Sequence, residues 1–260
     1  MRRERAPLWI GILAAIGAAF FIVPLLGLVV RTPWGDALRS LTSPDTLEAL
    51  KLSLIASLSA TALALVLGVP LAWVYARVDF PGRSIVRAMT TLPMVLPPVV
   101  GGIALLLAFG RRGLVGSWLA PIGITLPFTT AGVVMAETFV AMPFLVLTVE
   151  AGLRSMDRRY EDAARTLGAS RWKVFTRVTL PLIAPSIAAG AVLCWARALG
   201  EFGATITFAG NFPGVTQTMP LAVYLLLETN PQGSFVLSLI LLAVSLAVLV
   251  GLRHRWLGSA

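Results

Sequence analysis

The chain has 260 residues, of which 57% are hydrophobic and 13% are charged, and its formal net charge is +9. This composition excludes a soluble nucleic-acid-binding domain, because the arginine excess lies between long apolar runs and not on a polar, basic face. A single cysteine, Cys194, and a single histidine, His254, exclude a disulfide framework and argue against a metal site. The sequence therefore predicts a membrane protein that binds neither metal nor nucleic acid.

Six apolar runs predict six transmembrane helices, because about 20 apolar residues in a helix cross the hydrocarbon core and lipid offers the backbone no other hydrogen-bond partners. The predicted spans are residues 8–30, 50–76, 86–109, 129–153, 181–209 and 233–252. The first run is longer than the apolar core of a signal peptide and lacks a polar cleavage region, so we expect a retained anchor. We expect an all-α membrane protein with one transmembrane domain over residues 1–260.

Lysine and arginine are distributed unevenly among the connections. The amino terminus, the segments 77–87 and 154–180, and the carboxyl terminus together hold fifteen of them, whereas the connections on the other side hold five. Basic residues accumulate on the cytoplasmic side of membrane proteins. Both termini and the 154–180 loop are therefore predicted to be cytoplasmic.

The third run contains a cluster of helix-breaking residues: Pro93, Pro97, Pro98, Gly101 and Gly102. Proline removes a backbone donor and kinks a helix, and the freed carbonyls need partners from protein or from water in a cavity. Close packing of spans at small residues is one interpretation of the cluster, and kinked spans around a solvated pathway are the other.

The 154–180 loop contains a polar, helix-prone segment at residues 157–167. Glu161 is placed to pair with Arg165 one turn later, and Gly168 is suited to end the helix at a positive φ. Three residues share one face of the predicted helix: Tyr160, Ala164 and Leu167.

A second helical segment is predicted after this glycine. Ser170 is placed to cap it, and Pro181 is expected to end it where the fifth span begins. Bulky side chains recur along it every three residues: Trp172, Phe175 and Val178. A basic amphipathic helix on anionic lipid is one interpretation. The acids and small residues beside a turn favour the other, insertion into a groove of a partner protein.

These loop residues resemble the EAA loop of ABC importer permeases. The matching positions are Asp162-Ala163-Ala164, Gly168 and Val178-Thr179-Leu180-Pro181. Asp162 replaces the family's Glu and Val178 replaces its Ile, and both changes keep the chemistry. The resemblance implies a coupling helix that docks into an ATP-binding subunit. The coupling residues that it implies are Tyr160, Glu161, Asp162, Ala163, Ala164, Leu167 and Gly168.

The sequence contains no G-x-x-x-x-G-K-[ST] phosphate-binding loop. ATP and Mg are therefore expected to be bound by a separate chain. We expect this chain to be a transport subunit, not an enzyme, with no catalytic residues and no cofactor of its own.

Two charged residues lie in the predicted fifth span. A lone charge at membrane depth costs about 2.5–3.5 kcal/mol, so Arg197 and Glu201, four residues apart, are expected to form a structural ion pair. Small and hydroxyl-bearing residues lie near this pair: Gly200, Gly203, Ala204, Thr205 and Thr207. We expect them to offer exposed, uncharged groups that let an oxyanion pass without trapping it.

The stretches "ARALGEFGATITFAGN" and "TQTMPLAVY" resemble the molybdate and tungstate branch of oxyanion importer permeases. A sulfate or thiosulfate permease is the alternative. The resemblance implies a type I importer permease in the cytoplasmic membrane of a prokaryote. It further implies a homodimer of this chain, two cytoplasmic ATP-binding subunits and an extracytoplasmic molybdate-binding protein. Relatives form their gate from the third and fifth spans, which gives as candidates Pro97, Pro98, Gly200, Glu201, Gly203 and Thr205.

Two other classes of membrane protein are alternatives to an importer permease. An intramembrane enzyme needs a nucleophile with a base at membrane depth, and two acids, Glu137 and Glu201, are the candidates for a protease dyad, although neither lies in a recognisable motif. A passive channel would have no ATPase partner. The coupling loop therefore distinguishes an importer from a channel.

Overall fold

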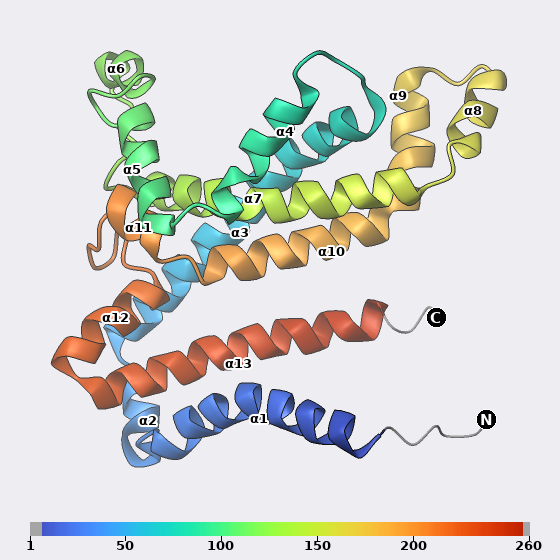
Figure 1. The fold of residues 1–260 in the computed structure, drawn as a ribbon. Coiled ribbons are helices and arrows are strands. Elements are labelled where there is room, and N and C mark those ends of the chain that lie inside the picture. Colours follow the sequence, from blue (N-terminus) through green and yellow to red (C-terminus); the bar gives the residue numbers. More distant parts are fainter. Residues whose placement is uncertain (1–6, 257–260) are drawn as a thin grey trace.

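The computed structural model describes residues 7–256, which form helices joined by turns, with no strand among them (Figure 1). Arg2, Arg3 and Arg5, which contribute to the predicted topology, lie outside the described residues. Within the described part, five helices are long and apolar enough to cross a membrane: α1 (Leu8–Arg31), α3 (Pro44–Arg77), α7 (Thr130–Ser155), the continuous run Arg171–Leu199 and α13 (Pro231–Trp256). The predicted all-α membrane fold is confirmed.

Shorter elements connect these helices. They are α2 (Trp34–Leu41), α4 (Arg83–Thr91), η1 (Leu92–Met94), α5 (Pro98–Phe109), α6 (Gly116–Leu119), η2 (Ala120–Ile122), α8 (Arg159–Thr166), α11 (Gly203–Phe208) and α12 (Met219–Thr229). The run Arg171–Leu199 consists of α9 (Arg171–Val174), the π-helical turn η3 (Phe175–Thr179) and α10 (Leu180–Leu199).

The predicted third span is a broken pair and not one helix. The segment Arg83–Met94 meets α5 at an angle of 119°. Pro97 and Pro98 cause the break, because a residue before proline is pushed out of the helical region, and Pro97 has φ −53° and ψ 129°. The pair counts as a sixth span only if its two halves cross the membrane together.

The predicted fifth span, residues 181–209, begins where α10 begins but differs from the continuous helix at both ends. The helix begins at Arg171, and Pro181 does not end the segment before it. Pro181 follows the π-helical turn η3, where wider winding accommodates a residue that lacks an N–H. At the other end the helix stops at Leu199, and α11 starts anew at Gly203.

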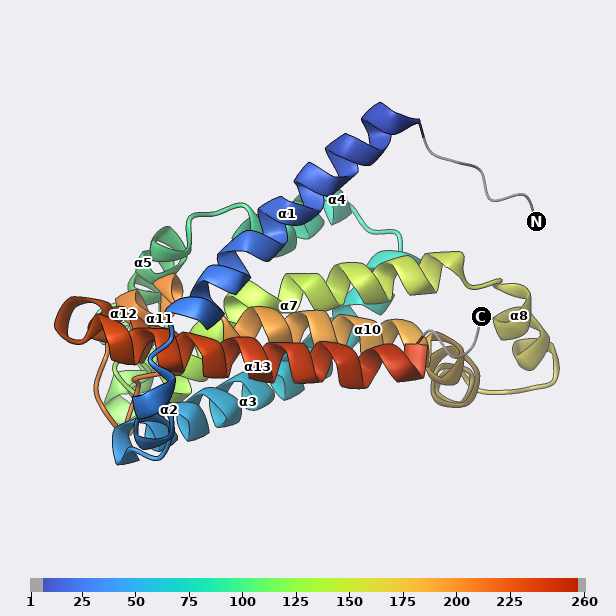
Figure 2. The same ribbon diagram turned by 90° about the horizontal axis from the view of Figure 1, so that it is seen from below.

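The centre of the molecule is formed by α3, α7 and α10, which run side by side (Figure 2). Small residues recur every four positions along the buried face of α3: Ala56, Ala60, Ala64, Gly68, Ala72 and Ala76. A Cβ on Gly68 would lie 3.1 Å from Leu145 of α7, and a Cβ on Gly190 of α10 would lie 3.0 Å from the same side chain. Leu145 thus fills the space between the two neighbouring helices, which approach closely because these residues are small.

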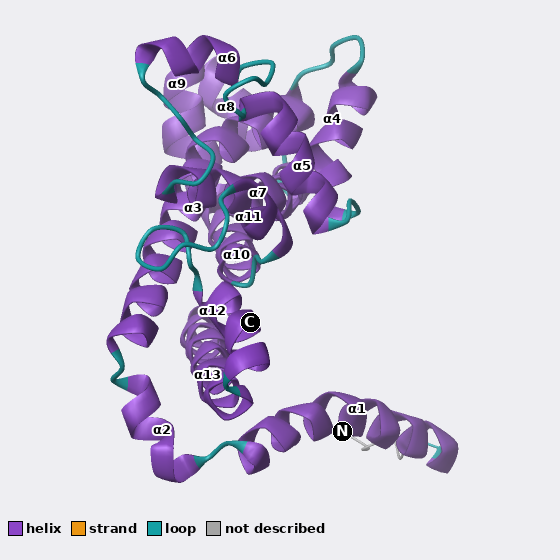
Figure 3. Ribbon diagram, turned by 90° about the vertical axis from the view of Figure 1, so that its left-hand side faces the viewer, coloured by secondary structure: helices purple, strands orange, loops and turns teal. Residues whose placement is uncertain are grey.

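Helix α1 stands apart from this centre (Figure 3). It has no buried residue, although it is strongly apolar, and it lies nearest to α2 and α13. An apolar helix surface of this size is covered by lipid or by another chain in a membrane protein. Helix α3 begins earlier than predicted, because Ser43 caps it and Pro44 occupies its first turn.

Candidate functional site

Helix α8 has a defined start and stop. The side chain of Asp157 accepts a hydrogen bond from the backbone N–H of Arg159 at its start (2.9 Å). At its end Gly168 has φ +80°, its N–H donates to the carbonyl of Arg165 (2.9 Å), and the N–H of Ala169 donates to that of Ala164 (3.0 Å). This is a Schellman ending, which needs a left-handed residue and therefore favours glycine. The turn at Gly168 lies where the sequence predicts it.

Glu161 attaches α8 to the body of the molecule. Its Oε2 lies 3.1 Å from Nε of Arg77 at the end of α3, and the two side chains are only 5% and 7% exposed. Its Oε1 accepts a hydrogen bond from the hydroxyl of Thr179 in η3 (2.7 Å). One carboxylate thus joins α8, α3 and the start of the Arg171–Leu199 helix.

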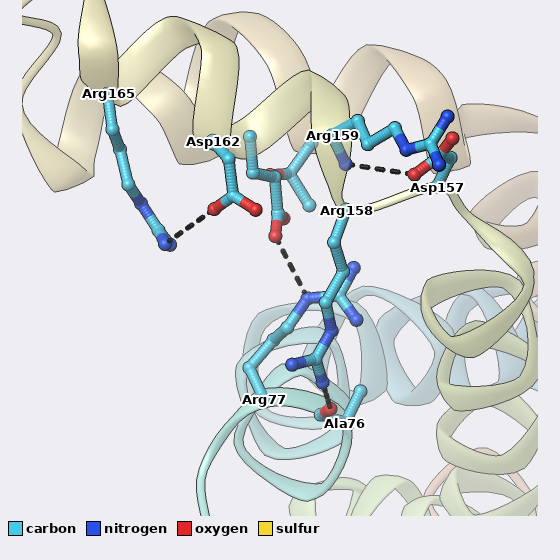
Figure 4. A network of polar contacts seen from close by, with 9 residues as sticks. Ala76, Arg77, Asp157, Arg158, Arg159, Asp162 and Arg165 are labelled. Atoms are coloured by element: carbon cyan, nitrogen blue, oxygen red, sulfur yellow. Dashed lines mark hydrogen bonds and ion pairs between the residues drawn. The ribbon is translucent and has the colours of Figure 1, made fainter.

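A second contact lies beside this pair. Nη2 of Arg158 donates to the carbonyl of Ala76 in the last turn of α3, 3.2 Å away (Figure 4). Helix carbonyls at a carboxyl terminus lack intrahelical donors, so an arginine there satisfies one of them. The Arg158 and Glu161 contacts together fix the orientation of α8 on α3.

Other side chains of α8 are exposed. Asp162 is 67% exposed, lines the same hollow as Glu161 and Arg77, and pairs with Arg165 at 3.3 Å. The predicted Glu161–Arg165 pair is therefore wrong: Glu161 is turned inward to Arg77, so its neighbour Asp162 is the acid within reach of Arg165. Tyr160 is exposed, and Leu167 is 88% exposed. Exposed apolar side chains grouped on a short polar helix are typical of a surface that contacts another protein.

The second segment is capped as predicted, and its three bulky residues do not share one buried face. Ser170 caps α9 by accepting a hydrogen bond from the backbone N–H of Lys173 (3.4 Å), in agreement with the sequence. Trp172 is exposed, however, and the buried residues are Val174 and Thr179. The π-helical winding of η3 shifts the faces, so a repeat of three residues does not form one buried stripe.

The gate candidates divide into two groups. Pro97, Pro98 and Gly200 are exposed, whereas Glu201, Gly203 and Thr205 are buried. The expectation that Gly203, Ala204 and Thr205 present exposed groups is wrong, because α11 packs directly on α5 and α7.

Glycines make this α5–α11 contact possible. A Cβ on Gly203 would lie 2.7 Å from Cβ of Pro98, and a Cβ on Gly102 would lie 2.6 Å from Cβ of Thr207. Both distances are shorter than non-bonded carbon contacts allow. The two helices are therefore packed backbone to backbone across the breaks in both spans.

Arg197 and Glu201 form an ion pair with 2.6 Å between Nη2 and Oε2. They do not lie on one continuous helix, since α10 ends between them. The other oxygen of Glu201 accepts a hydrogen bond from the backbone N–H of Ala204 in the first turn of α11 (2.8 Å). Glu201 thus connects the end of α10 to the start of α11. Both oxygens of this acid, one of the two named for a protease dyad, therefore already have partners.

The sequence interpretation missed a second charged group, centred on Glu150 of α7. This buried acid lies 3.0 Å from Nε of Arg87 and 2.7 Å from Nη2 of Arg154. An acid within an apolar run, with an arginine four residues later, is the signal that could have found it.

The arrangement of helices is that of ABC importer permeases. The chain superposes on a chain of a crystal structure of a bacterial ABC transporter that imports the acidic polysaccharide alginate, with a TM-score of 0.75, 21% identity, and coverage of 96% of this chain and 94% of that one. A second structure of the bacterial alginate transporter, in complex with an alginate pentasaccharide-bound periplasmic protein, gives a TM-score of 0.74 at 20% identity and covers 95% of this chain and 92% of that one. At these identities the likeness establishes the fold.

The sequence matches the family of binding-protein-dependent transport system inner membrane components over residues 64–259, and the chain belongs to this family. It is 46% identical over 251 residues to the molybdenum transport system permease protein ModB of Mycobacterium tuberculosis, covering 96% of this chain and 94% of the relative. It is 44% identical over 218 residues to ModB of Escherichia coli, covering 84% and 95%. Identity to the sulfate transport system permease protein CysT of Escherichia coli is 36% over 237 residues, covering 89% and 85%.

Proposed function

We propose that this chain is the membrane-spanning permease subunit of an ATP-driven importer that carries molybdate, and the chemically similar tungstate, into the cytoplasm. The observation that carries the substrate is the higher identity to the ModB proteins, 46% over 96% of the chain, than to the sulfate permease, 36% over 89%. ATP hydrolysis belongs to a separate partner chain.

The two faces of α8 support the coupling role. Tyr160, Asp162 and Leu167 are exposed and free to contact an ATP-binding subunit. The buried Glu161 of the same helix holds α8 to Arg77 and Thr179. A movement imposed on the exposed face is thereby passed to α3 and to the Arg171–Leu199 helix, because a buried ion pair resists separation.

The partners follow from the surfaces that this chain leaves uncovered. Apolar side chains four residues apart are exposed along the broken third span: Val95, Val99, Ile103 and Leu107. We assign this face to a second copy of the chain, and the apolar surface of α1 to lipid or that copy. Two ATP-binding subunits cover α8 in the pair of copies. An extracytoplasmic molybdate-binding protein delivers the anion, as the periplasmic protein in the alginate transporter complex suggests by analogy.

The proposed topology puts both termini and the 154–180 loop in the cytoplasm of a prokaryote. The start of α1, the end of α13 and the helices α8 and α9 all lie toward the same side of the molecule (Figure 1). Alternating access then consists of rigid-body rocking of the two copies. The packed α5–α11 unit, with Pro97, Pro98 and Gly200 at its exposed edge, forms the gate.

The test is cellular molybdenum content, measured by elemental mass spectrometry in cells with and without this chain. The cells are grown at trace molybdate under a large excess of sulfate. We expect the deletion to lose molybdenum while sulfur assimilation stays normal. A vector carrying the gene restores molybdenum, which controls for effects on neighbouring genes.

A sulfate or thiosulfate permease is the second candidate, because the sulfate relatives share about a third of the sequence. Unchanged molybdenum together with sulfur starvation in the deletion would move the chain to that branch. Unchanged levels of both elements would contradict the oxyanion substrate altogether.

A further inference from the structure

A basic hollow of about 380 Å³ lies at the turn between α3 and α4, apart from α8 and from the gate residues. It is bounded by the 78–82 turn, the first turns of α4 and the end of α7. Its lining residues are Phe80, Gly82, Arg83, Ser84, Arg87 and Arg154. Three arginines from two helices therefore line one open hollow.

The acids nearby do not neutralise these arginines completely. Arg87 and Arg154 share the single buried carboxylate of Glu150. Arg83 pairs with Asp79, whose side chain is almost fully exposed. Three positive charges thus face two negative ones, and the site keeps an excess of one positive charge. Each guanidinium has five N–H donors, so most of them are not used by the acids.

The geometry of α4 adds further donors. The helix begins after Gly82, which has φ +80° and provides no side-chain cap. The N–H of Arg83 donates to the carbonyl of Phe80 (3.3 Å) and the N–H of Ile85 to that of Gly82 (2.9 Å), which leaves the N–H of Ser84 in the first turn for an anion. The Ser84 hydroxyl lies in the same lining. Guanidinium, amide and hydroxyl donors around one cavity are the set that binds the oxygens of a tetrahedral anion.

The surroundings point to a phospholipid. Helix α4 exposes Ile85, Val86 and Met89 beside its arginines. A short helix with apolar and basic side chains of this kind lies in the membrane interface, where anionic headgroups meet acyl chains. Basic pockets between transmembrane helices on the cytoplasmic side bind such headgroups.

We propose that the hollow is a binding site for a tetrahedral oxyanion, and that the phosphate of an anionic phospholipid occupies it. The bound phosphate contacts arginines of both α4 and α7 and so holds the first half of the broken third span against the central bundle. The proposal rests on the proposed function only for the side of the membrane, since the loop between α3 and α4 lies toward the same end of the molecule as α8 and α9 (Figure 1).

The test measures lipid binding by native mass spectrometry of the purified full-length protein in neutral detergent. Phosphatidylglycerol and phosphatidylcholine are added at equal concentrations. We expect phosphatidylglycerol to bind more tightly, and Arg83→Gln to weaken its binding about fivefold, the effect of one basic residue near a charged lipid surface. Arg83→Gln disrupts no buried pair, because Asp79 is exposed.

Two further variants complete the design. The double variant Arg83→Gln/Arg154→Gln is expected to lose the preference for phosphatidylglycerol over phosphatidylcholine. Arg177→Gln is the matched control, since it removes the same charge from an exposed position of η3 outside the hollow. Its lipid preference should equal that of the unaltered protein.

Inorganic phosphate and molybdate distinguish the source of the oxyanion. If millimolar phosphate or molybdate displaces phosphatidylglycerol, and binds with the same dependence on Arg83, the site serves a free oxyanion of the cytoplasm. If neither competes, the phospholipid is the ligand. Equal binding of both lipids without any Arg83-dependent binding of the free anions would overturn the proposal, as would equal losses in Arg83→Gln and Arg177→Gln. Lipid binding is measured independently of molybdate uptake. The lipid-site proposal and the transport proposal can therefore fail separately.

Discussion

The 154–180 loop and the α5–α11 region are both places where a helix stops and a new one begins, yet different forces hold them. In the loop, the buried carboxylate of Glu161 joins three elements through Arg77 and Thr179. In the α5–α11 region, Gly102 and Gly203 let two backbones touch, and Glu201 only bridges the end of α10 to the start of α11.

This difference matches the roles proposed for the two regions. A buried ion pair holds two helices in one orientation. Removing either partner is strongly destabilising, because the other charge is left buried and unpaired. Close packing of small residues keeps two segments together through contact between their backbones, without a charge pair between α5 and α11. Substitutions should therefore affect the loop through charge and the α5–α11 region through volume.

The largest effect is expected for Gly168→Trp. Gly168 has φ +80°, and a side chain there points into open space on the exposed side of the turn, so the change both strains the backbone and obstructs the proposed docking surface. We expect ATP-dependent molybdate uptake into membrane vesicles to be abolished while the protein stays inserted. Asp162→Lys, which reverses the exposed charge, is expected to do the same.

Gly168→Asn is the matched control, because asparagine tolerates the left-handed conformation better than other side chains. It should keep most of the uptake. Unchanged transport in both Gly168→Trp and Asp162→Lys would contradict the coupling role of α8.

The adjacent acids of α8 provide the next comparison. Glu161→Ala leaves Arg77 buried and unpaired, which is expected to cost about 3–5 kcal/mol. Asp162→Ala removes only an exposed pair and should cost less than about 1 kcal/mol. Thermal unfolding of the purified complex measures both. The double variant Arg77→Leu/Glu161→Leu removes both charges and should recover most of the stability, and equal losses in the two single variants would contradict the buried role of Glu161.

For the α5–α11 contact we expect a volume effect. Gly203→Ala forces a methyl group against Pro98 and is expected to cost about 1–3 kcal/mol in stability. Gly200→Ala is the control, since its Cβ would be 3.6 Å from the nearest atom, the carbonyl oxygen of Ala196. The same unfolding measurement applies, and a tolerated Gly203→Ala would argue against the tight packing of these helices.

The smallest effect is expected for the exchange of Arg197 and Glu201. Arg197→Ala and Glu201→Ala should each lower expression and uptake more than the exchange Arg197→Glu/Glu201→Arg. The exchange restores the pair but cannot restore the acceptor for the Ala204 N–H, so a deficit of about 1 kcal/mol should remain. An exchange no better than the single variants would argue that the cap, and not the pair, is what matters.

Local signals made much of this molecule predictable from its sequence. Long apolar runs locate the spans because lipid permits only helices that satisfy their own backbone. Gly168 and Ser170 locate the turn and the cap of the loop because each acts on the backbone within a few residues. The pairing of Arg197 with Glu201 was likewise expected from their spacing.

Tertiary contacts decided the rest. Nothing local distinguishes Glu161 from Asp162; the first is buried only because Arg77, far away in the sequence, lies on its side of α8. The Pro97–Pro98 pair predicts a break in the helix. The angle of 119° between Arg83–Met94 and α5, however, depends on how α5 packs on α11. The burial of Gly203 and Thr205, and the gathering of Arg83, Arg87 and Arg154 at one hollow, arise from the same cause. Side chains distant in sequence come into contact only when the helices pack. Patterns among neighbouring residues in the sequence therefore do not predict these contacts.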